Sequence, residues 1–441
     1  MKIFRYLMLS SLLLFLTQCQ KDDRGPSDDT NTYSSALAID HMELIRELAK
    51  FHPGYSPPVV SRTFGYAGLT LYEALVHGMP EYKSLAGTLN DLTDLPLPES
   101  GYTYHWGQVA NAAMGEVEKL YFPAAPANLK PQMTYISANY KTEYLSKSSD
   151  AIIKRSTEYG IAIANAIYEY SKTDGGHNSY LTNYPASYIV PTGFGYWVPT
   201  GPNLIPLQPT WGNKRTFVKD LVNTTQPINH TDYSIDKSSV FYKQALEVYT
   251  TVQHLTPEQL TIAKFWSDDP GLPGTPPGHS ISITSQVLKN ENSSLAVAAE
   301  AYAKVGFAVA DAFISCWKCK YVFNLIRPVT YINQNIDPNW KTILSTPPFP
   351  EYTSGHSVQS GATARVLSEL FGYNYSFIDY THSKRTDIDG SGRSFRSFDE
   401  AAQEAAISRL YGGIHYREAI DLGVSQGYKV GDEVNALPFK K

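Results

Sequence analysis

Three clusters of residues between positions 317 and 421 carry side chains that bind oxyanions and move protons. The first contains Lys320 and Arg327, the second is Ser354-Gly355-His356, and the third contains Arg409 and His415. Permanent cations neutralise negative charge, and backbone N–H groups at the start of a helix hold oxygen atoms. Imidazoles move protons or bond the central atom of the ligand. Together these groups are what a pocket for a tetrahedral oxyanion requires.

The first cluster is predicted to lie at the end of a long helix over residues 301–326. Residues seven positions apart lie nearly on one helix face, so Lys320 and Arg327 share a face with Trp317. Pro328 disfavours helical geometry at Arg327. We therefore expect the helix to end there and the arginine to reach inward. A lysine and an arginine on a solvated surface is the alternative interpretation.

The second cluster is predicted to begin a helix. Apolar residues at helical spacing follow over 363–371, so a loop would deliver Ser354, Gly355 and His356 to the first turn. Gly355 lets a ligand approach the backbone closely, and the exposed N–H groups of a first turn favour an anion. The alternative is an ordinary serine N-cap followed by an incidental histidine.

The third cluster is predicted to lie on an alanine-rich helix that starts with a capping box at 397–400. Arg409 and His415 are six residues apart, so a straight helix would point them about 240° apart. The glycine pair at 412–413 would allow a kink or a close approach of a ligand. Glu418 follows His415 by three residues and is placed to hold the far ring nitrogen. The alternative is a core histidine with satisfied hydrogen bonds.

In this order the clusters resemble the signature of the superfamily that joins type 2 phosphatidic acid phosphatases, bacterial acid phosphatases and vanadium-dependent haloperoxidases. That signature is Lys, six residues, Arg-Pro; then Pro-Ser-Gly-His; then Ser-Arg, five residues, His, three residues, Asp. The first part matches fully here, whereas Thr353 replaces the proline and Ala419 replaces the final aspartate. The missing carboxylate would then come from Glu418 or Asp421. The resemblance also suggests that Asp268 or Asp269 lies behind an arginine of the site.

The resemblance implies one of two reactions, because phosphate and vanadate are near-isosteres. In a phosphatase, His415 attacks phosphorus and His356 protonates the leaving alcohol. In a haloperoxidase the cofactor is vanadate, His415 bonds vanadium, and His356 helps to deprotonate hydrogen peroxide, which Lys320 polarises once it is bound. The remaining vanadate-binding groups implied by the resemblance are Lys320, Arg327, Ser354, Gly355 and Arg409.

Two aromatic residues, Trp317 and Phe349, favour the haloperoxidase. Haloperoxidases of this superfamily place aromatics at matching positions beside the halide, where a dry ring edge suits a large, soft anion. Simple core packing is the alternative role for both residues. We therefore expect a vanadium-dependent haloperoxidase acting on hydrogen peroxide and a halide (iodide first, then bromide), with small organic acceptors of the hypohalous acid. The alternatives are an exported acid phosphatase that works through a phosphohistidine and a lipoprotein that binds an oxyanion without turnover.

Residues 35–441 are predicted to form one all-α domain of packed helical bundles, with the active-site core at 301–430. The chain has 441 residues, 42% of them hydrophobic, and strand signals are few. The net charge of -5 gives no indication of a nucleic-acid partner. Residues 175–231 are rich in Pro, Gly, Asn and aromatics without clear periodicity. This stretch is either a lid or rim over the pocket or a surface excursion.

The N-terminus is predicted to direct export. Lys2 and Arg5 precede a short apolar run and then Cys19, which resembles a bacterial lipoprotein signal over 1–18, with an ordinary signal peptide as the alternative. Residues 19–34 read as a disordered tether. The protein would then be a lipoprotein of the cell envelope, in the periplasm or on the outer surface, that touches the membrane only through its lipid anchor. Cys316 and Cys319 are interpreted as packing residues, with a strained disulfide as the alternative.

Overall fold

The computed structural model describes residues 23–200, 204–227, 229–268 and 274–441, which contain fourteen α-helices and two short strands. The predicted all-α class is confirmed. No helix in these ranges is long and apolar enough to cross a membrane. The predicted signal peptide, Cys19 and the residues up to position 22 lie outside the described residues.

Residues 23–34 correct the prediction of a disordered tether. Thr30, in the short 3-10 helix η1 (Thr30–Thr32), is buried, and its Oγ1 donates a hydrogen bond to the carbonyl of Gly78 at 2.9 Å. Asp23 forms an ion pair with Arg155. Composition alone suggested disorder, because the partners that hold this segment are 48 and 132 positions away in the sequence.

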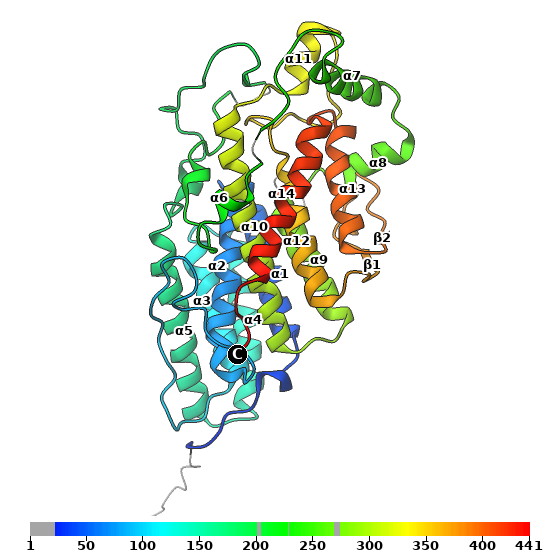
Figure 1. The fold of residues 1–441 in the computed structure, drawn as a ribbon. Helices are drawn as coiled ribbons and strands as arrows, with labels where there is room; N and C mark the ends of the chain where they lie inside the picture. Colours follow the sequence, from blue (N-terminus) through cyan, green and yellow to red (C-terminus); the bar gives the residue numbers. More distant parts are fainter. Residues whose placement is uncertain (1–22, 201–203, 228, 269–273) are drawn as a thin grey trace, which may run out of the picture.

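The N-terminal helices form the lower part of the molecule in Figure 1. Pro57 and Pro58 at the first positions of α2 suit a helix start, where a backbone N–H has no intrahelical partner. α2 is buried along nearly its whole length. The elements are α1 (Ala36–Phe51), α2 (Pro57–Leu75), η2 (Val76–Gly78), α3 (Trp106–Tyr121), α4 (Lys130–Leu145) and α5 (Asp150–Lys172).

The long helix α10 (Leu295–Phe323) lies between the N-terminal and C-terminal helices in Figure 1 and packs on α2, α12 and α14. It is apolar around most of its surface, as expected of a helix buried on all sides. Its backbone touches that of α2, because a Cβ at Gly68 would lie 2.3 Å from the carbonyl oxygen of Tyr302. The helix ends at Phe323, earlier than predicted, because Asn324 adopts left-handed geometry (φ 51°).

Two carboxyl groups are buried near this helix pair. Asp311 of α10 accepts the backbone N–H groups of Phe217 and Val218 at 2.8 and 3.0 Å. Glu73 of α2 accepts the hydroxyl of Ser84 at 2.7 Å and the N–H of Leu85 at 2.8 Å. Burial raises the pKa of each carboxyl to about 7.

The C-terminal helices pack against the other side of α10. Contacts join α12 to both α13 and α14, and a small antiparallel hairpin pairs Phe377 with Phe395. α13 ends before Gly412, so His415 lies in the turn between two helices and not on the single helix predicted for this cluster. The elements are α12 (Gly355–Phe371), β1 (Phe377–Asp379), β2 (Arg393–Phe395), α13 (Phe398–Tyr411) and α14 (Arg417–Asn435).

The remaining elements lie between α5 and α12 in the sequence. Within 175–231, described residues such as Asn183, Tyr184 and Leu207 line the main cavity, as expected of a rim. Cys316 and Cys319 are buried free thiols. These elements are η3 (Ser179–Leu181), η4 (Trp211–Asn213), α6 (Leu221–Thr225), α7 (Val240–Gln253), α8 (Pro257–Phe265), α9 (Thr275–Asn290) and α11 (Pro328–Asn335).

Candidate active site

A cavity of about 550 Å³ lies where the three sequence clusters meet. Its lining includes most of the residues proposed from the sequence: Asp268, Trp317, Phe349, Gly355, His356, Arg409 and His415. Lys320, Arg327 and Ser354 are fully buried next to them. Tertiary folding therefore brings together three segments that are separated by dozens of residues in the chain.

His415 is held in one orientation by Glu351. Oε1 of Glu351 accepts from Nδ1 of His415 at 2.8 Å and from the backbone N–H of Tyr416 at 2.9 Å. Burial, together with the charge of Arg327, keeps the pKa of His415 well below its usual value, so the ring is neutral. A neutral ring that donates from Nδ1 carries its lone pair on Nε2, the atom that can bond a metal.

The carboxylates expected to orient His415 were predicted wrongly. Glu418 instead accepts hydrogen bonds from Thr231 and Gln244, and Asp421 is exposed. The i+3 argument fails because His415 precedes α14 and does not lie on it. Glu351 was missed because it lies 64 positions from His415 in the sequence. Its place five residues before His356 gives no local signal either.

Lys320 and Arg327 fix the loop that precedes α12. Nζ of Lys320 donates to the carbonyls of Pro350, Glu351 and Thr353. Burial lowers the pKa of this amine to about 8. The result is a cation that acts on the cavity through its charge while it holds the loop in place.

The guanidinium of Arg327 lies against His415, the candidate metal ligand. Nε donates to the carbonyl of Phe349 at 3.0 Å, and Nη1 donates to that of Ile414 at 2.8 Å and lies 3.1 Å from Nε2 of His415. Burial lowers the pKa of Arg327 to about 10. Arg327 is the N-cap of α11, in the extended geometry that a following proline favours.

The start of α12 agrees with the sequence prediction. Ser354 is the N-cap, and its hydroxyl accepts the N–H of Ser357. Among the described residues, a Cβ added at Gly355 would meet only Trp317, at 3.7 Å, and Gly355 lines the cavity. Thr353, which replaces the proline of the family signature, donates from Oγ1 to Gln426 at 2.7 Å. The threonine therefore anchors the turn by a hydrogen bond that proline cannot make.

The pocket suits a tetrahedral oxyanion such as vanadate. Among the described residues, Nη2 of Arg327 and Nε2 of His356 are buried without a hydrogen-bond partner. Buried polar groups are normally paired, so orphaned ones at a cavity indicate a ligand. Arg409 adds a third cation, held by the hydroxyl of Ser408 and the carbonyl of Trp266. These groups, with Nε2 of His415, are the donor set that vanadate requires.

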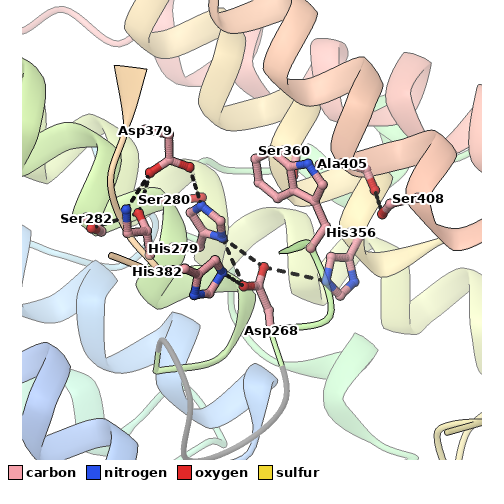
Figure 2. Close-up of polar contacts among 12 residues, drawn as sticks. Asp268, His279, Ser280, Ser282, His356, Ser360, Asp379, His382, Ala405 and Ser408 are labelled. Atoms are coloured by element: carbon pink, nitrogen blue, oxygen red, sulfur yellow. Dashed lines mark hydrogen bonds and ion pairs between the residues drawn. The ribbon is translucent and has the colours of Figure 1, made fainter. Parts of the chain in front are cut away.

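His356 lies beside Asp268 at the cavity. Its Nε2 is 3.7 Å from Oδ2 of Asp268, and burial lowers the pKa of the imidazole well below its usual value. We expected Asp268 behind an arginine, whereas its carboxylate in the structure contacts imidazole nitrogens of His356, His279 and His382, as Figure 2 shows. The related prediction for Asp269 lies outside the described residues. The sequence did not single out His279 or His382.

Trp317 and Phe349 form an aromatic wall. Their ring centroids are 4.9 Å apart, and Nζ of Lys320 lies 5.0 Å from the centroid of Phe349. Nε1 of Trp317 donates to the carbonyl of Leu207 at 3.2 Å, so the indole is fixed by the 175–231 segment. The wall is thus rigid and positively biased.

Comparisons with known proteins identify the family of the chain. A family model described as the VCPO second helical-bundle domain matches residues 300–438. The vanadium chloroperoxidase of Curvularia inaequalis is 27% identical over 220 residues, which are 37% of this chain and only 36% of that protein.

Solved structures extend the comparison to most of the chain. A holo-type bacterial vanadium-dependent chloroperoxidase has a TM-score of 0.63 at 17% identity over 88% of this chain and 93% of that one, which shows the shared fold. A crystal structure described as the first bacterial vanadium-dependent iodoperoxidase has a TM-score of 0.81 at 38% identity. That match covers 92% of this chain and 96% of the other. The chain therefore belongs to the family of vanadium-dependent haloperoxidases.

Proposed function

We propose that this protein uses bound vanadate and hydrogen peroxide to oxidise iodide, and bromide as a second substrate, to the hypohalous acid. The observation that carries the proposal is the orientation of the His415 ring. Glu351 fixes its Nδ1, and its Nε2 meets Arg327 at a cavity walled by Trp317 and Phe349. The 38% identical relative is described as an iodoperoxidase, which supports iodide as the first substrate.

Vanadate would be held by Nε2 of His415 and by the positive groups around it. When bound, it supplies the Lewis acid that activates hydrogen peroxide toward a halide. Arg327 presents its unpartnered Nη2, while Gly355 presents the backbone of a helix start. Lys320 contributes mainly through its charge, because the three N–H groups of its ammonium donate to loop carbonyls.

His356 is the residue that would accept a proton from hydrogen peroxide. Its imidazole is neutral, and its Nε2 has no hydrogen-bond partner among the described residues. The imidazolium formed in this step would be stabilised by the carboxylate of Asp268, 3.7 Å away. The same proton can then be returned to a departing oxygen.

The aromatic wall supports halide as the substrate. The edges of Trp317 and Phe349 carry partial positive charge, and the neighbouring Lys320 adds to it. A large, soft anion loses little hydration energy when it enters such a surface. Small organic acceptors of the hypohalous acid would use the same cavity of about 550 Å³.

The test compares two activities in protein that lacks residues 1–22 and has been stripped of metal. Iodide oxidation by hydrogen peroxide is measured with and without orthovanadate, and para-nitrophenyl phosphate hydrolysis is measured in parallel. His415→Ala should abolish the vanadate-dependent activity, whereas His254→Ala, at an exposed histidine that ends α7, should not.

Three outcomes would refute the proposal. Efficient phosphate-ester hydrolysis that vanadate only inhibits would make the protein a phosphatase. Tight oxyanion binding without either activity would make it a binding protein. Full iodide oxidation in a folded His415→Ala variant would remove His415 from the site.

A further inference from the structure

A cluster of side chains of the types that bind metals lies behind His356, and the proposed reaction uses only one of them, the carboxylate of Asp268. Asp268 follows α8, His279 lies on α9, and His382 follows β1, and all three are at most 2% exposed. Figure 2 shows their side chains converging on one point. We propose that Asp268, Nδ1 of His279 and Nε2 of His382 bind a divalent transition-metal ion, zinc, separate from the vanadate.

The distances suit such an ion. Nδ1 of His279 lies 2.9 and 3.1 Å from the two carboxylate oxygens of Asp268, and Nε2 of His382 lies 3.4 Å from Oδ1. One ligand atom from each residue lies within 4.8 Å of the others. Tetrahedral zinc with bonds of roughly 2.0–2.1 Å places its ligand atoms about 3.3 Å apart. Only small side-chain movements would separate the present geometry from a zinc site.

His382 provides an independent indication of a ligand. Both of its ring nitrogens are buried without a hydrogen-bond partner among the described residues. Burying an imidazole with two unpaired nitrogens is unfavourable, because both lose their hydrogen bonds to water. The contact of Nε2 with Asp268 at 3.4 Å does not have hydrogen-bond alignment. A metal ion bonded to Nε2 would satisfy this nitrogen.

The surroundings of His279 match those of a metal-binding histidine. Its Nε2 donates to Oδ2 of Asp379 at 2.6 Å. Asp379 is held in turn by the N–H and hydroxyl of Thr381 and by the amide of Gln286. A carboxylate behind a histidine in this way fixes the tautomer, so that Nδ1, which contacts Asp268 here, is the nitrogen that would bond the metal.

The charges are also consistent with a divalent cation. Asp268 and Asp379 place two carboxylates in a buried cluster. With both histidines neutral, a divalent ion balances these two negative charges. Without the ion, the balance depends on a proton that His279 shares between the two carboxylates.

Zinc is the metal that best fits this donor set in this protein. Two histidines and a carboxylate bind zinc or iron(II), and three protein ligands leave a fourth position for water. Hydrogen peroxide oxidises iron(II) but not zinc, so the choice between them rests on the proposed function. The ion would fix Asp268 and, through it, the position of His356, 3.7 Å away.

The test needs neither vanadate nor halide, so its failure is distinct from failure of the proposed function. The protein is purified without chelators, and its metals are counted by mass spectrometry. After treatment with a chelator, cobalt(II) and zinc are titrated in, and the cobalt absorption bands report tetrahedral coordination. We expect one equivalent of zinc, displaced by cobalt with intense visible bands.

Three variants connect the metal to these residues. His382→Ala removes a ring that makes no hydrogen bond to the described residues, so the fold should be retained while the cobalt bands are lost. Asp379→Asn keeps an acceptor behind His279 and should weaken zinc binding about 10- to 100-fold. His254→Ala is the exposed control and should bind zinc like the parent protein.

The proposal would be overturned by folded protein that takes up no first-row metal. It would also be overturned by unchanged zinc and cobalt binding in His382→Ala. Tight binding of iron(II), with weak binding of zinc, would refute the zinc assignment.

Discussion

The buried carboxyl of Glu73 gives a prediction whose magnitude follows from the structure. Glu73 is 2% exposed in α2, and burial raises its pKa to about 7 from an ordinary value of 4.5. Replacing it with glutamine removes the titratable group. The amide oxygen can still accept the N–H of Leu85, and the amide nitrogen can donate to the hydroxyl oxygen of Ser84.

The sign of the effect follows from proton linkage. The folded state holds the Glu73 proton more tightly than the unfolded state, so wild-type stability falls as the pH rises from about 4.5 to about 7. One pKa unit corresponds to about 1.4 kcal/mol. The charge therefore costs on the order of 1 kcal/mol at pH 5 and on the order of 3 kcal/mol at pH 8. Glu73→Gln should gain about 2 kcal/mol more stability at pH 8 than at pH 5.

The assay is urea unfolding of wild type and variant at both pH values. Glu158→Gln, at an exposed position of α5, is the control and should show no pH-dependent gain. Asp311→Asn should gain less stability than Glu73→Gln, because one amide oxygen must replace two carboxylate oxygens that each accept a backbone N–H group. An equal effect of Glu73→Gln at pH 5 and pH 8 would refute the reasoning.

Three further predictions concern the site, the helix contact and the thiols. Glu351→Gln should lower vanadate-dependent activity about 10- to 100-fold, because it removes the carboxylate that orients His415, the proposed vanadium ligand; Glu418→Gln should leave activity unchanged, and the opposite order would restore the sequence-based assignment. Gly68→Ala should lower the melting temperature, since its Cβ would lie 2.3 Å from a carbonyl oxygen of α10; an unchanged melting temperature would contradict this close contact. Cys316 and Cys319 should react with a thiol reagent in denaturant but not in the native protein, and one disulfide in place of two thiols would show the assignment to be wrong.

Much of the fold class and of the oxyanion pocket was readable from the sequence because the signals are local. Helical periodicity is set by neighbours three and four positions apart. The N-cap at Ser354 and the extended geometry at Arg327 depend on residues next to them. The sequence therefore singled out Lys320, Arg409 and His415 as candidates, and their roles in the reaction stay predictions.

The partners of these residues were decided only by tertiary structure. Glu351 meets His415 across 64 positions, and Asp379 meets His279 across 100. The tether was predicted wrongly for the same reason, since its partners lie far along the chain. A carboxylate in a loop is not part of a periodic sequence pattern. Which side chain it orients depends on which helix packs beside the loop. By itself the sequence determined which residue types, at which spacings, make up the candidate site. The packing of α10, α12, α13 and α14 decided which carboxylates contact them, because burial forces each polar group to pair with whatever the fold brings near.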